Sequence, residues 1–233
     1  MVAELRDLDL LQRGNKETDE VTISNITEAY GALVVAGSRS REFLERISDA
    51  NLDSDHFPWL TGKEIVLAGV PLRALRINHV GKLGWELHIL LAHLEQVYDE
   101  VWTAGGLFGI VNFGSYAVNS IRPEKAWPGW GVELTNEITL IEAELERFVK
   151  YDIGDFVGRE SIFRRKQDRV QTSLVYVGVA AGEADVRGSE PLFAGVQVIG
   201  MTKSGGYGYA VKKEPGLRFR GSRIHQAREL LRH

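Results

Sequence analysis

The hydrophobic pattern of this chain changes near residue 150, and this change restricts the possible folds more than any other feature. Before it, strand-like apolar runs alternate with amphipathic helical segments, whereas almost every apolar run after it is strand-like. This order predicts an α+β fold in three parts. A polar segment covers residues 1–20, an α+β domain covers 21–150, and a small β-rich domain with a basic tail covers 151–233.

Local signals predict the individual elements. Ser38 is suited to cap the first helix, and Gly69 joins two strand-like runs as a hairpin turn. Apolar residues three and four apart, followed by a Gly-Gly pair, mark the clearest helix. The expected strands are 21–27, 31–37, 63–69, 70–81, 83–91, 106–113, 172–180, 192–200 and 204–213, and the expected helices are 38–47, 94–105, 114–121 and 155–167.

Charge is distributed unevenly along the chain. From Lys203 to the C-terminus there are eight basic and two acidic residues, so the preceding part carries a net charge of −10. A basic tail can indicate a nucleic-acid partner. Here the acidic body would repel phosphates, and beyond Tyr207 and Tyr209 the tail offers Phe219 but no interleaved series of aromatic residues. We therefore expect a solvated tail and no nucleic-acid partner.

Several functional classes are excluded by what the sequence lacks. Without cysteine there can be no thiolate zinc site, iron–sulfur cluster, disulfide or cysteine nucleophile. No dinucleotide fingerprint, P-loop, G-x-S-x-G or H-E-x-x-H motif is present. His88 and His93 lie five residues apart across a strand-to-helix junction, a spacing that does not bring two imidazoles onto one metal. The acidic N-terminal segment is not a signal peptide, and no apolar run is long enough to cross a bilayer.

Residues 78–87, NHVGKLGWEL, look unlike plain structure. Two glycines bracket a turn, and Trp85 and Glu86 then open a strand with their side chains on opposite faces. One of the two must face inward. An inward Glu86 would need paired donors, which a flat heterocycle with an N–H beside an amino group supplies as well as an arginine does. The alternative, which periodicity alone favours, is an exposed glutamate on a sheet face.

Residues 120–131, SIRPEKAWPGWG, form the second unusual segment. They concentrate an arginine, a carboxylate, an ammonium group and two indoles in one turn, and Pro123 ends the preceding helix. Such a set can hold an aromatic ligand that carries a carboxylate, with Trp127 and Trp130 for stacking and Arg122 for the anion. The alternative is a turn that covers the core and carries a surface ion pair. The residues alone leave both interpretations open.

Separated motifs follow one another in a recognisable order: VTISNITEAYGALVVAGSRSREFL, LRINHVGKLGWELHI, SIRPEKAWPGWG, IEAEL, DFVGRESI and GMTKSGGYG. Through these motifs, from about residue 21 to about residue 213, the chain resembles the folate-binding aminomethyltransferase family. That family includes the glycine cleavage T-protein and the carboxy-terminal halves of dimethylglycine and sarcosine dehydrogenases. The G-x-L-G-W-E-L wording at 81–87 is closest to the dehydrogenase branch.

The resemblance implies a T-protein-like fold, in which a ferredoxin-like α/β body is followed by a small all-β, barrel-like domain. It also implies tetrahydrofolate in a central hole, where the one-carbon unit of an aminomethyl or iminium donor is captured as 5,10-methylenetetrahydrofolate. Glu86 matches the glutamate that pairs with the pterin amino and ring N–H groups, and Arg122 matches an arginine of the folate site. His79, Trp85 and Trp130 complete the expected cofactor-binding residues, and no metal ligand is implied.

Some positions depart from the family pattern. His79 replaces a tyrosine, Lys82 an acidic residue, Pro123 an aliphatic residue and Leu140 a proline. The catalytic aspartate of the family is expected upstream of this chain, so no catalytic residue is assigned. The sequence after residue 213 does not resemble the closing strands of the family.

The leading hypothesis is therefore a tetrahydrofolate-binding, aminomethyltransferase-like module of a dimethylglycine or sarcosine dehydrogenase-type protein. Its expected partners are folate, a small N-methyl or aminomethyl donor and, because the chain has no FAD fingerprint, a partner chain with an FAD domain. Two alternatives remain open: a non-catalytic folate-binding, regulatory or scaffold relative, and a fragment that needs such a partner. The expected location is the cytoplasm, or the mitochondrial matrix in a eukaryote.

Overall fold

The computed structural model describes residues 4–168, 170, 172–179, 186–209 and 217–221. The chain divides into two compact units. Unit 1 consists of Met1–Asn78 and Lys82–Val111, and unit 2 consists of His79–Gly81 and Asn112–His233. These bounds differ from those of the domains expected from the sequence, which remain a prediction. Each unit contains one four-stranded antiparallel sheet.

Unit 1 contains four strands and three α-helices, joined in part by short 3-10 helices. Its strand order is β1-β4-β3-β2. The elements are α1 Glu4–Gly14, η1 Glu17–Asp19, η2 Thr27–Ala29, β1 Tyr30–Ala36, α2 Ser40–Ile47, β2 Gly62–Leu67, β3 Val70–Leu75, β4 Gly84–Leu90, η3 Leu91–His93, α3 Leu94–Gly105 and η4 Gly106–Phe108.

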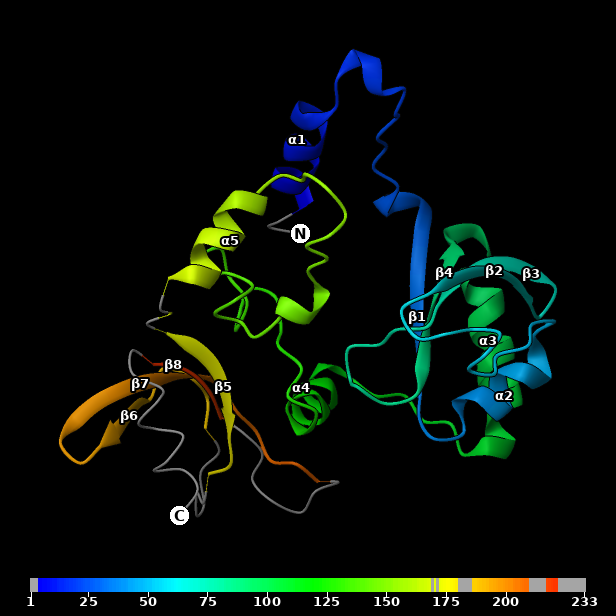
Figure 1. The fold of residues 1–233 in the computed structure, drawn as a ribbon. Helices are drawn as coiled ribbons and strands as arrows, with labels where there is room; N and C mark the ends of the chain where they lie inside the picture. Colours follow the sequence, from blue (N-terminus) through cyan, green and yellow to red (C-terminus); the bar gives the residue numbers. More distant parts are fainter. Residues whose placement is uncertain (1–3, 169, 171, 180–185, 210–216, 222–233) are drawn as a thin grey trace. The chain divides into compact units, whose positions relative to one another are not determined.

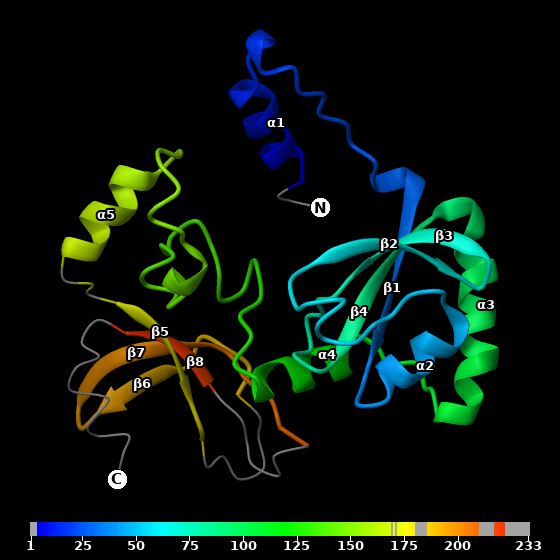
Figure 2. The same cartoon turned by 45° about the vertical axis from the view of Figure 1, so that its right-hand side comes forward.

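The core of unit 1 lies between its sheet and the helices α2 and α3, which cover the same face (Figures 1 and 2). Trp85, Leu87 and Ile89 occupy alternate positions of β4 and are completely buried there. Phe57, from the loop after α2, meets Trp85 edge-on, with 6.3 Å between the ring centroids. Burying side chains of this size contributes roughly 2 to 3 kcal/mol each, so this layer is the main source of stability in unit 1.

The hairpin predicted around Gly69 is confirmed. Leu67 and Val70 are paired, and the two turn residues Ala68 and Gly69 have φ values of +50° and +77°. Positive φ at both central positions is typical of the tight turn whose twist matches that of the flanking strands. The helices predicted at 38–47 and 94–105 are also found, as α2 and α3.

The strand predicted at 21–27 is wrong. Residues 21–26 have no regular structure, and the side chain of Asn25 accepts a hydrogen bond from the backbone N–H of Thr27, which begins η2. Asn25 and Thr27 also donate to Glu4 of α1, a helix in a segment that was expected only to be polar. Polar side chains that bond locally compete with strand pairing, which explains the difference.

Two further predictions near helix ends are wrong. Ser38 does not cap α2, which begins at Ser40; the Ser40 hydroxyl instead donates to the carbonyl of Gly37, at 2.8 Å. The strand predicted at 106–113 is replaced by η4 and irregular chain. There the N–H of Ile110 donates to the carbonyl of Gly105. This bond forms a turn directly after α3.

The described residues of unit 2 form two α-helices, a 3-10 helix and four strands in the order β5-β8-β7-β6. The helices predicted at 114–121 and 155–167 are found in shifted form. The first one includes Pro123 and ends at Glu124, so the helix end predicted at Pro123 is wrong. The strand predicted at 192–200 is a hairpin that turns at Gly195. The elements are α4 Ser115–Glu124, η5 Glu146–Phe148, α5 Arg159–Gln167, β5 Ser173–Val177, β6 Pro191–Ala194, β7 Gln197–Ser204 and β8 Leu217–Gly221.

The expectation of a wholly solvated tail is wrong for β8, because this strand pairs with both β5 and β7. Residues 222–233 of the basic tail and 210–213 of the strand predicted at 204–213 lie outside the described residues. The described part of that strand contains the end of β7 and no further strand.

Helices and strands are mixed in both units, as expected for an α+β fold. Within the described residues, the second sheet ends at β5 and β6, so the barrel-like closure stays a prediction. No described helix combines the length and the apolar character needed to cross a bilayer.

Gly84 begins β4 where a side chain does not fit. A Cβ there would lie 2.5 Å from the carbonyl oxygen of Val35 and 2.9 Å from the Cα of Ala36. We predict that Gly84→Ala lowers the free energy of unfolding by about 2 kcal/mol, because the backbone of β1 has to move. Urea unfolding followed by tryptophan fluorescence measures this loss.

Gly106→Ala is the matched control. No atom lies within 4 Å of a Cβ added at Gly106, and its φ of −54° suits any residue. Alanine at this position should leave the free energy of unfolding unchanged or raise it by up to about 1 kcal/mol. An equal loss in both variants would show that the contact with β1 is not the cause.

Candidate functional site

Strand β4 sends its two notable side chains to opposite faces of the first sheet. Trp85 is completely buried in the core, whereas Glu86 lies on the other face with 27% of its side chain exposed. Trp85 is therefore the inward residue of the pair, and its ring has no surface left for a ligand. Its expected folate contact stays a prediction.

The surroundings of Glu86 are apolar on both sides. In register it is paired with Val34 of β1 and Leu75 of β3. His88 lies on the same face, with 3.7 Å between its Nε2 and Glu86 Oε2. Among the described residues, no group donates a hydrogen bond to the Glu86 carboxylate. A half-buried carboxylate in this state can accept two N–H groups of a flat ligand.

A tight turn precedes β4. Its Gly81 has a φ of +65°, and a Cβ there would lie 2.6 Å from the indole nitrogen of Trp127. The segment His79–Gly81 is therefore packed against the Trp127-containing turn of unit 2, residues 125–134, which we call the tryptophan turn. His79 is exposed in this segment. Among the expected site residues, unit 2 thus contains His79, Arg122 and Trp130, and unit 1 contains Trp85 and Glu86.

Arg122 forms a buried ion pair, which differs both from the direct anion contact and from the surface ion pair that the sequence left open. Only 5% of Arg122 and 1% of Glu133 are exposed. Arg122 Nη1 lies 3.0 Å from both carboxylate oxygens of Glu133 and donates to the carbonyl of Trp127 at 2.9 Å. The carbonyl of Trp127 and the carboxylate of Glu133 thus share one nitrogen, which ties the tryptophan turn to α4.

Glu133 is the residue that sequence reasoning missed. Its carboxylate also accepts the N–H of Gly129 at 2.6 Å and the hydroxyl of Ser204 from β7. Burial raises the pKa of Glu133, but the hydrogen bonds from Ser204, Gly129 and Arg122 outweigh burial and hold the pKa below its ordinary value. A Cβ at Gly129 would lie 3.2 Å from the carboxylate, so the glycine beside Trp130 is a signal of this close approach.

Trp130 is displayed by this arrangement. Its side chain is 59% exposed, while the backbone beside it is fixed by the bond from the N–H of Gly131 to the carbonyl of Leu134. The motif at 200–208 closes the same region, because the carbonyl of Tyr207 accepts the hydroxyl of Ser120 in α4 at 2.6 Å. Motifs more than 70 residues apart are therefore joined in unit 2.

Glu142, in the IEAEL motif, is a second buried carboxylate that joins segments of unit 2. It is 3% exposed and accepts hydrogen bonds from the N–H and hydroxyl of Thr139, from Arg165 of α5 and from the hydroxyl of Thr172. Burial raises the pKa of Glu142, but these donors outweigh burial and lower it to about 2. The carboxylate is ionised at neutral pH and joins α5 to the approach of β5.

The family of the chain follows from its similarity to known proteins. Residues 1–153 match the GCVT N-terminal domain family. The chain belongs to this family. The match covers well over half of the 233 residues, and it includes β4 with Glu86, the buried Arg122–Glu133 pair and Glu142.

Several relatives of this GCVT domain are longer proteins. Human mitochondrial dimethylglycine dehydrogenase is 36% identical over 213 residues, which are 91% of this chain and 25% of that protein. The mouse mitochondrial pyruvate dehydrogenase phosphatase regulatory subunit is 32% identical, over 82% of this chain and 22% of its own length. The aminomethyltransferase of Thermoanaerobacter sp. (strain X514) is 27% identical, over 92% and 58% respectively. The chain thus spans about a quarter of the dehydrogenase.

A solved structure shows the same fold. The glycine cleavage system aminomethyltransferase T of Bartonella henselae superposes with a TM-score of 0.77 at 19% identity, covering 94% of this chain and 58% of that one. The expected T-protein-like fold with mixed helices and strands is therefore confirmed. This GCVT domain is aminomethyltransferase-like and related to the dehydrogenase branch, as the sequence motifs indicated.

Removing one partner of the buried ion pair should be costly. Glu133→Gln leaves the Arg122 guanidinium buried without its counter-charge, so we predict a loss of about 3 kcal/mol in the free energy of unfolding, measured in urea. Asp152→Asn, at an exposed position of the same unit, controls for the lost charge. The double variant Arg122→Met with Glu133→Leu should lose less than the sum of the two single changes, and strictly additive losses would contradict the pairing.

Glu142 should make stability depend on acid pH. Its pKa is about 2 in the folded chain and 4.5 ordinarily, so its contribution of about 3 kcal/mol is complete above pH 4.5 and disappears as the pH falls to 2. We predict that Glu142→Gln lowers stability at pH 7 and makes the loss between pH 5 and pH 2 shallower. Urea unfolding at constant ionic strength measures both effects, with exposed Glu160→Gln as the charge control.

Proposed function

We propose that this GCVT-domain chain binds a reduced folate and takes part in aminomethyl transfer within a protein of dimethylglycine dehydrogenase type. The supporting observation is the Glu86 carboxylate. It is half-buried between Val34 and Leu75 and lacks a hydrogen-bond donor among the described residues. A pterin ring presents an amino group beside a ring N–H, which is the donor pair that such a carboxylate needs.

The residues have distinct roles in this proposal. Tetrahydrofolate, when bound, would accept the one-carbon unit of a small N-methyl or aminomethyl donor. Glu86 would hold the pterin and fix its orientation, and the exposed indole of Trp130 offers a stacking surface. Arg122 does not fit the direct anion contact expected for it, because its Nη1 binds Glu133 and the carbonyl of Trp127. We assign Arg122 to shaping the turn that displays Trp130.

The oxidation step of the reaction needs groups other than the residues of this site. Oxidation of an N-methyl donor needs redox chemistry, and this chain has no dinucleotide fingerprint, so we propose that an FAD-containing region or partner chain supplies it. We propose the mitochondrial matrix as its location in a eukaryote and the cytoplasm in a bacterium, because the relatives include mammalian proteins named mitochondrial and bacterial aminomethyltransferases.

A regulatory relative that binds folate without transfer activity is the second candidate. One observation favours it: a relative 32% identical to this chain is named as the regulatory subunit of a phosphatase. His79, Lys82 and Pro123 also favour a regulatory relative, because each departs from the residue expected in the family pattern.

The role of Glu86 can be tested by binding. We predict that Glu86→Gln weakens tetrahydrofolate binding 10- to 100-fold, because one acceptor oxygen becomes an N–H donor facing the pterin donors. Titration followed by intrinsic tryptophan fluorescence or calorimetry measures the affinity. Glu64→Gln is the matched control, since Glu64 lies on β2 of the same sheet and pairs with Arg73 in solvent. Unchanged affinity in Glu86→Gln would remove Glu86 from the site.

A turnover assay separates the two candidates. The wild-type chain is incubated with tetrahydrofolate and an aminomethyl donor, and release of methylenetetrahydrofolate is measured. Product above background supports the transferase, and binding without product supports the regulatory relative. If tetrahydrofolate does not bind, both are contradicted.

A further inference from the structure

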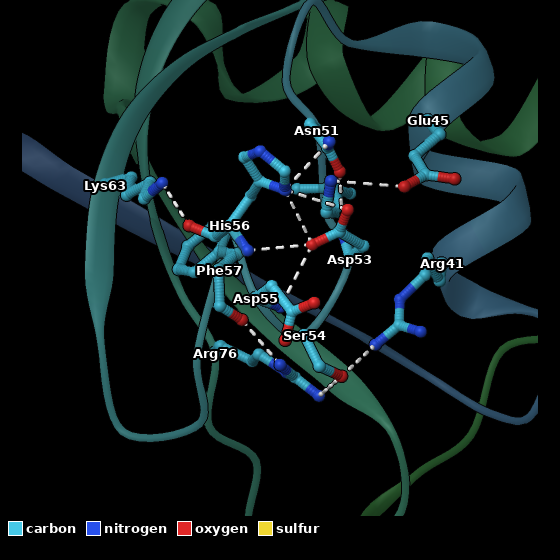
Figure 3. Close-up of polar contacts among 11 residues, drawn as sticks. Arg41, Glu45, Asn51, Asp53, Ser54, Asp55, His56, Phe57, Lys63 and Arg76 are labelled. Carbon is cyan, nitrogen blue, oxygen red and sulfur yellow. Dashed lines mark hydrogen bonds and ion pairs between the residues drawn. The ribbon is translucent and has the colours of Figure 1, made fainter.

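The loop between α2 and β2 holds a polar cluster that the proposed function does not use (Figure 3). Arg41 reaches it from α2, and Arg76 reaches it from the chain just after β3. Both side chains point to Ser54 in the loop. We call Arg41, Ser54 and Arg76 the arginine–serine cluster.

Two guanidinium groups converge on one hydroxyl oxygen. Arg41 Nη2 donates to Ser54 Oγ at 3.1 Å, and Arg76 Nη2 donates to the same oxygen at 3.2 Å. A hydroxyl has two acceptor lone pairs, and here both face cations. The hydroxyl proton of Ser54 is left to donate elsewhere, and Ser54 is exposed. Three donor groups, two guanidinium groups and one hydroxyl, thus meet at the exposed Ser54.

No ion pair neutralises the arginines of the cluster among the described residues. Within the part of the chain that the structure describes, neither Arg41 nor Arg76 has a carboxylate oxygen within 4.0 Å. Of the neighbouring acids, Asp53 accepts from the backbone and ring of His56, and Glu45 accepts from a loop N–H. The carboxylate of Asp55, the residue after Ser54, has no hydrogen bond or ion pair among the described interactions (Figure 3). Burial lowers the pKa of Arg76, and the charge of Arg41 lowers it further. Two unneutralised cations held together in this way favour an anion between them.

The geometry of Arg41 suits an oxyanion. Its Nε is shielded from solvent and has no hydrogen-bond partner among the described residues. Nε and Nη2 lie on the same edge of a guanidinium group, the edge that binds two oxygens of a carboxylate or phosphate at once. Only one donor of this edge is used, on Ser54. An anion with several oxygens would satisfy both.

The loop that carries Ser54 is held in place by its own bonds. Asn51 accepts the N–H of Asp53, the carbonyl of His56 accepts from Lys63, and the carbonyl of Phe57 accepts from Arg76 at 2.5 Å (Figure 3). Because these contacts are made within the chain, they position Ser54 independently of the proposed anion.

We propose that the arginine–serine cluster is a binding site for a tetrahedral oxyanion of the phosphate class, either free phosphate or a small phosphate monoester. The site is separate from the proposed folate contact. The Arg76 guanidinium lies 5.9 Å from the centroid of the Trp85 ring, on the core side of β4, whereas Glu86 is on the opposite face. The proposal therefore does not depend on folate binding.

The test is binding of inorganic phosphate to the whole chain at constant ionic strength. Calorimetry and the thermal midpoint should show saturable binding of phosphate and of sulfate, and no effect of chloride. Arg41→Gln and Arg76→Gln should each weaken phosphate binding about tenfold or more, because each removes charge-assisted hydrogen bonds. Arg46→Gln is the matched control, since Arg46 is on the same helix but lies over Phe108, 5.7 Å from its ring centroid.

A variant that keeps the positive charge distinguishes a loss of binding from misfolding. Arg41→Lys retains one cation but loses the paired N–H edge, so it should weaken phosphate several-fold, less than Arg41→Gln does. Glycerol 3-phosphate tests the source: tighter binding than phosphate indicates a monoester site, and equal or weaker binding indicates free phosphate. A phosphate effect that rises linearly, equals that of chloride or survives unchanged in Arg41→Gln and Arg76→Gln overturns the proposal.

Discussion

The alternation of side chains along β4 determines the chemistry on both faces of the first sheet. Trp85 is the largest completely buried side chain, so its place in the core fixes Glu86 on the other face. A slip of one residue would reverse both, at the cost of exposing an indole and burying a charge. Gly84 prevents such a slip, because the backbone of β1 approaches it too closely for any other residue. The proposed pterin contact is therefore a consequence of core packing.

Unit 2 is held together in a different way. Among the described residues, its buried apolar side chains are Val80, Pro123, Ala143 and Leu174, whereas the core of unit 1 has fourteen. Unit 2 instead contains the buried carboxylates of Glu133 and Glu142, and each accepts hydrogen bonds from several segments of the chain. Buried charges are tolerated only when such networks are nearly complete. Unit 2 should therefore respond to acid more strongly than unit 1, whose stability comes mainly from apolar burial.

Sequence patterns predicted the elements that depend on local chemistry. The hairpin at Gly69 follows from turn geometry and α3 from the spacing of its apolar residues, and both were found. Patterns could not decide between Trp85 and Glu86 as the inward residue, since that depends on the volume available in the core. The pairing of Glu133 with Arg122 and Ser204 was not predictable, because Ser204 lies 71 residues away. The strand expected at 21–27 failed because polar side chains there bond to α1.

The two faces of β4 carry separate candidate sites. On the core side, Arg76 lies over Trp85 and joins Arg41 at Ser54; on the other side, Glu86 has no contact with these residues among the described interactions. Two backbone links join the faces: Trp85 and Glu86 are neighbours in β4, and Glu86 is paired with Leu75, the residue before Arg76. Neighbouring sites on one element can couple, whereas distant sites contribute additively. An anion at the arginine–serine cluster would therefore stabilise the loop over Trp85, and any effect on a ligand at Glu86 would pass through the paired backbones of β3 and β4.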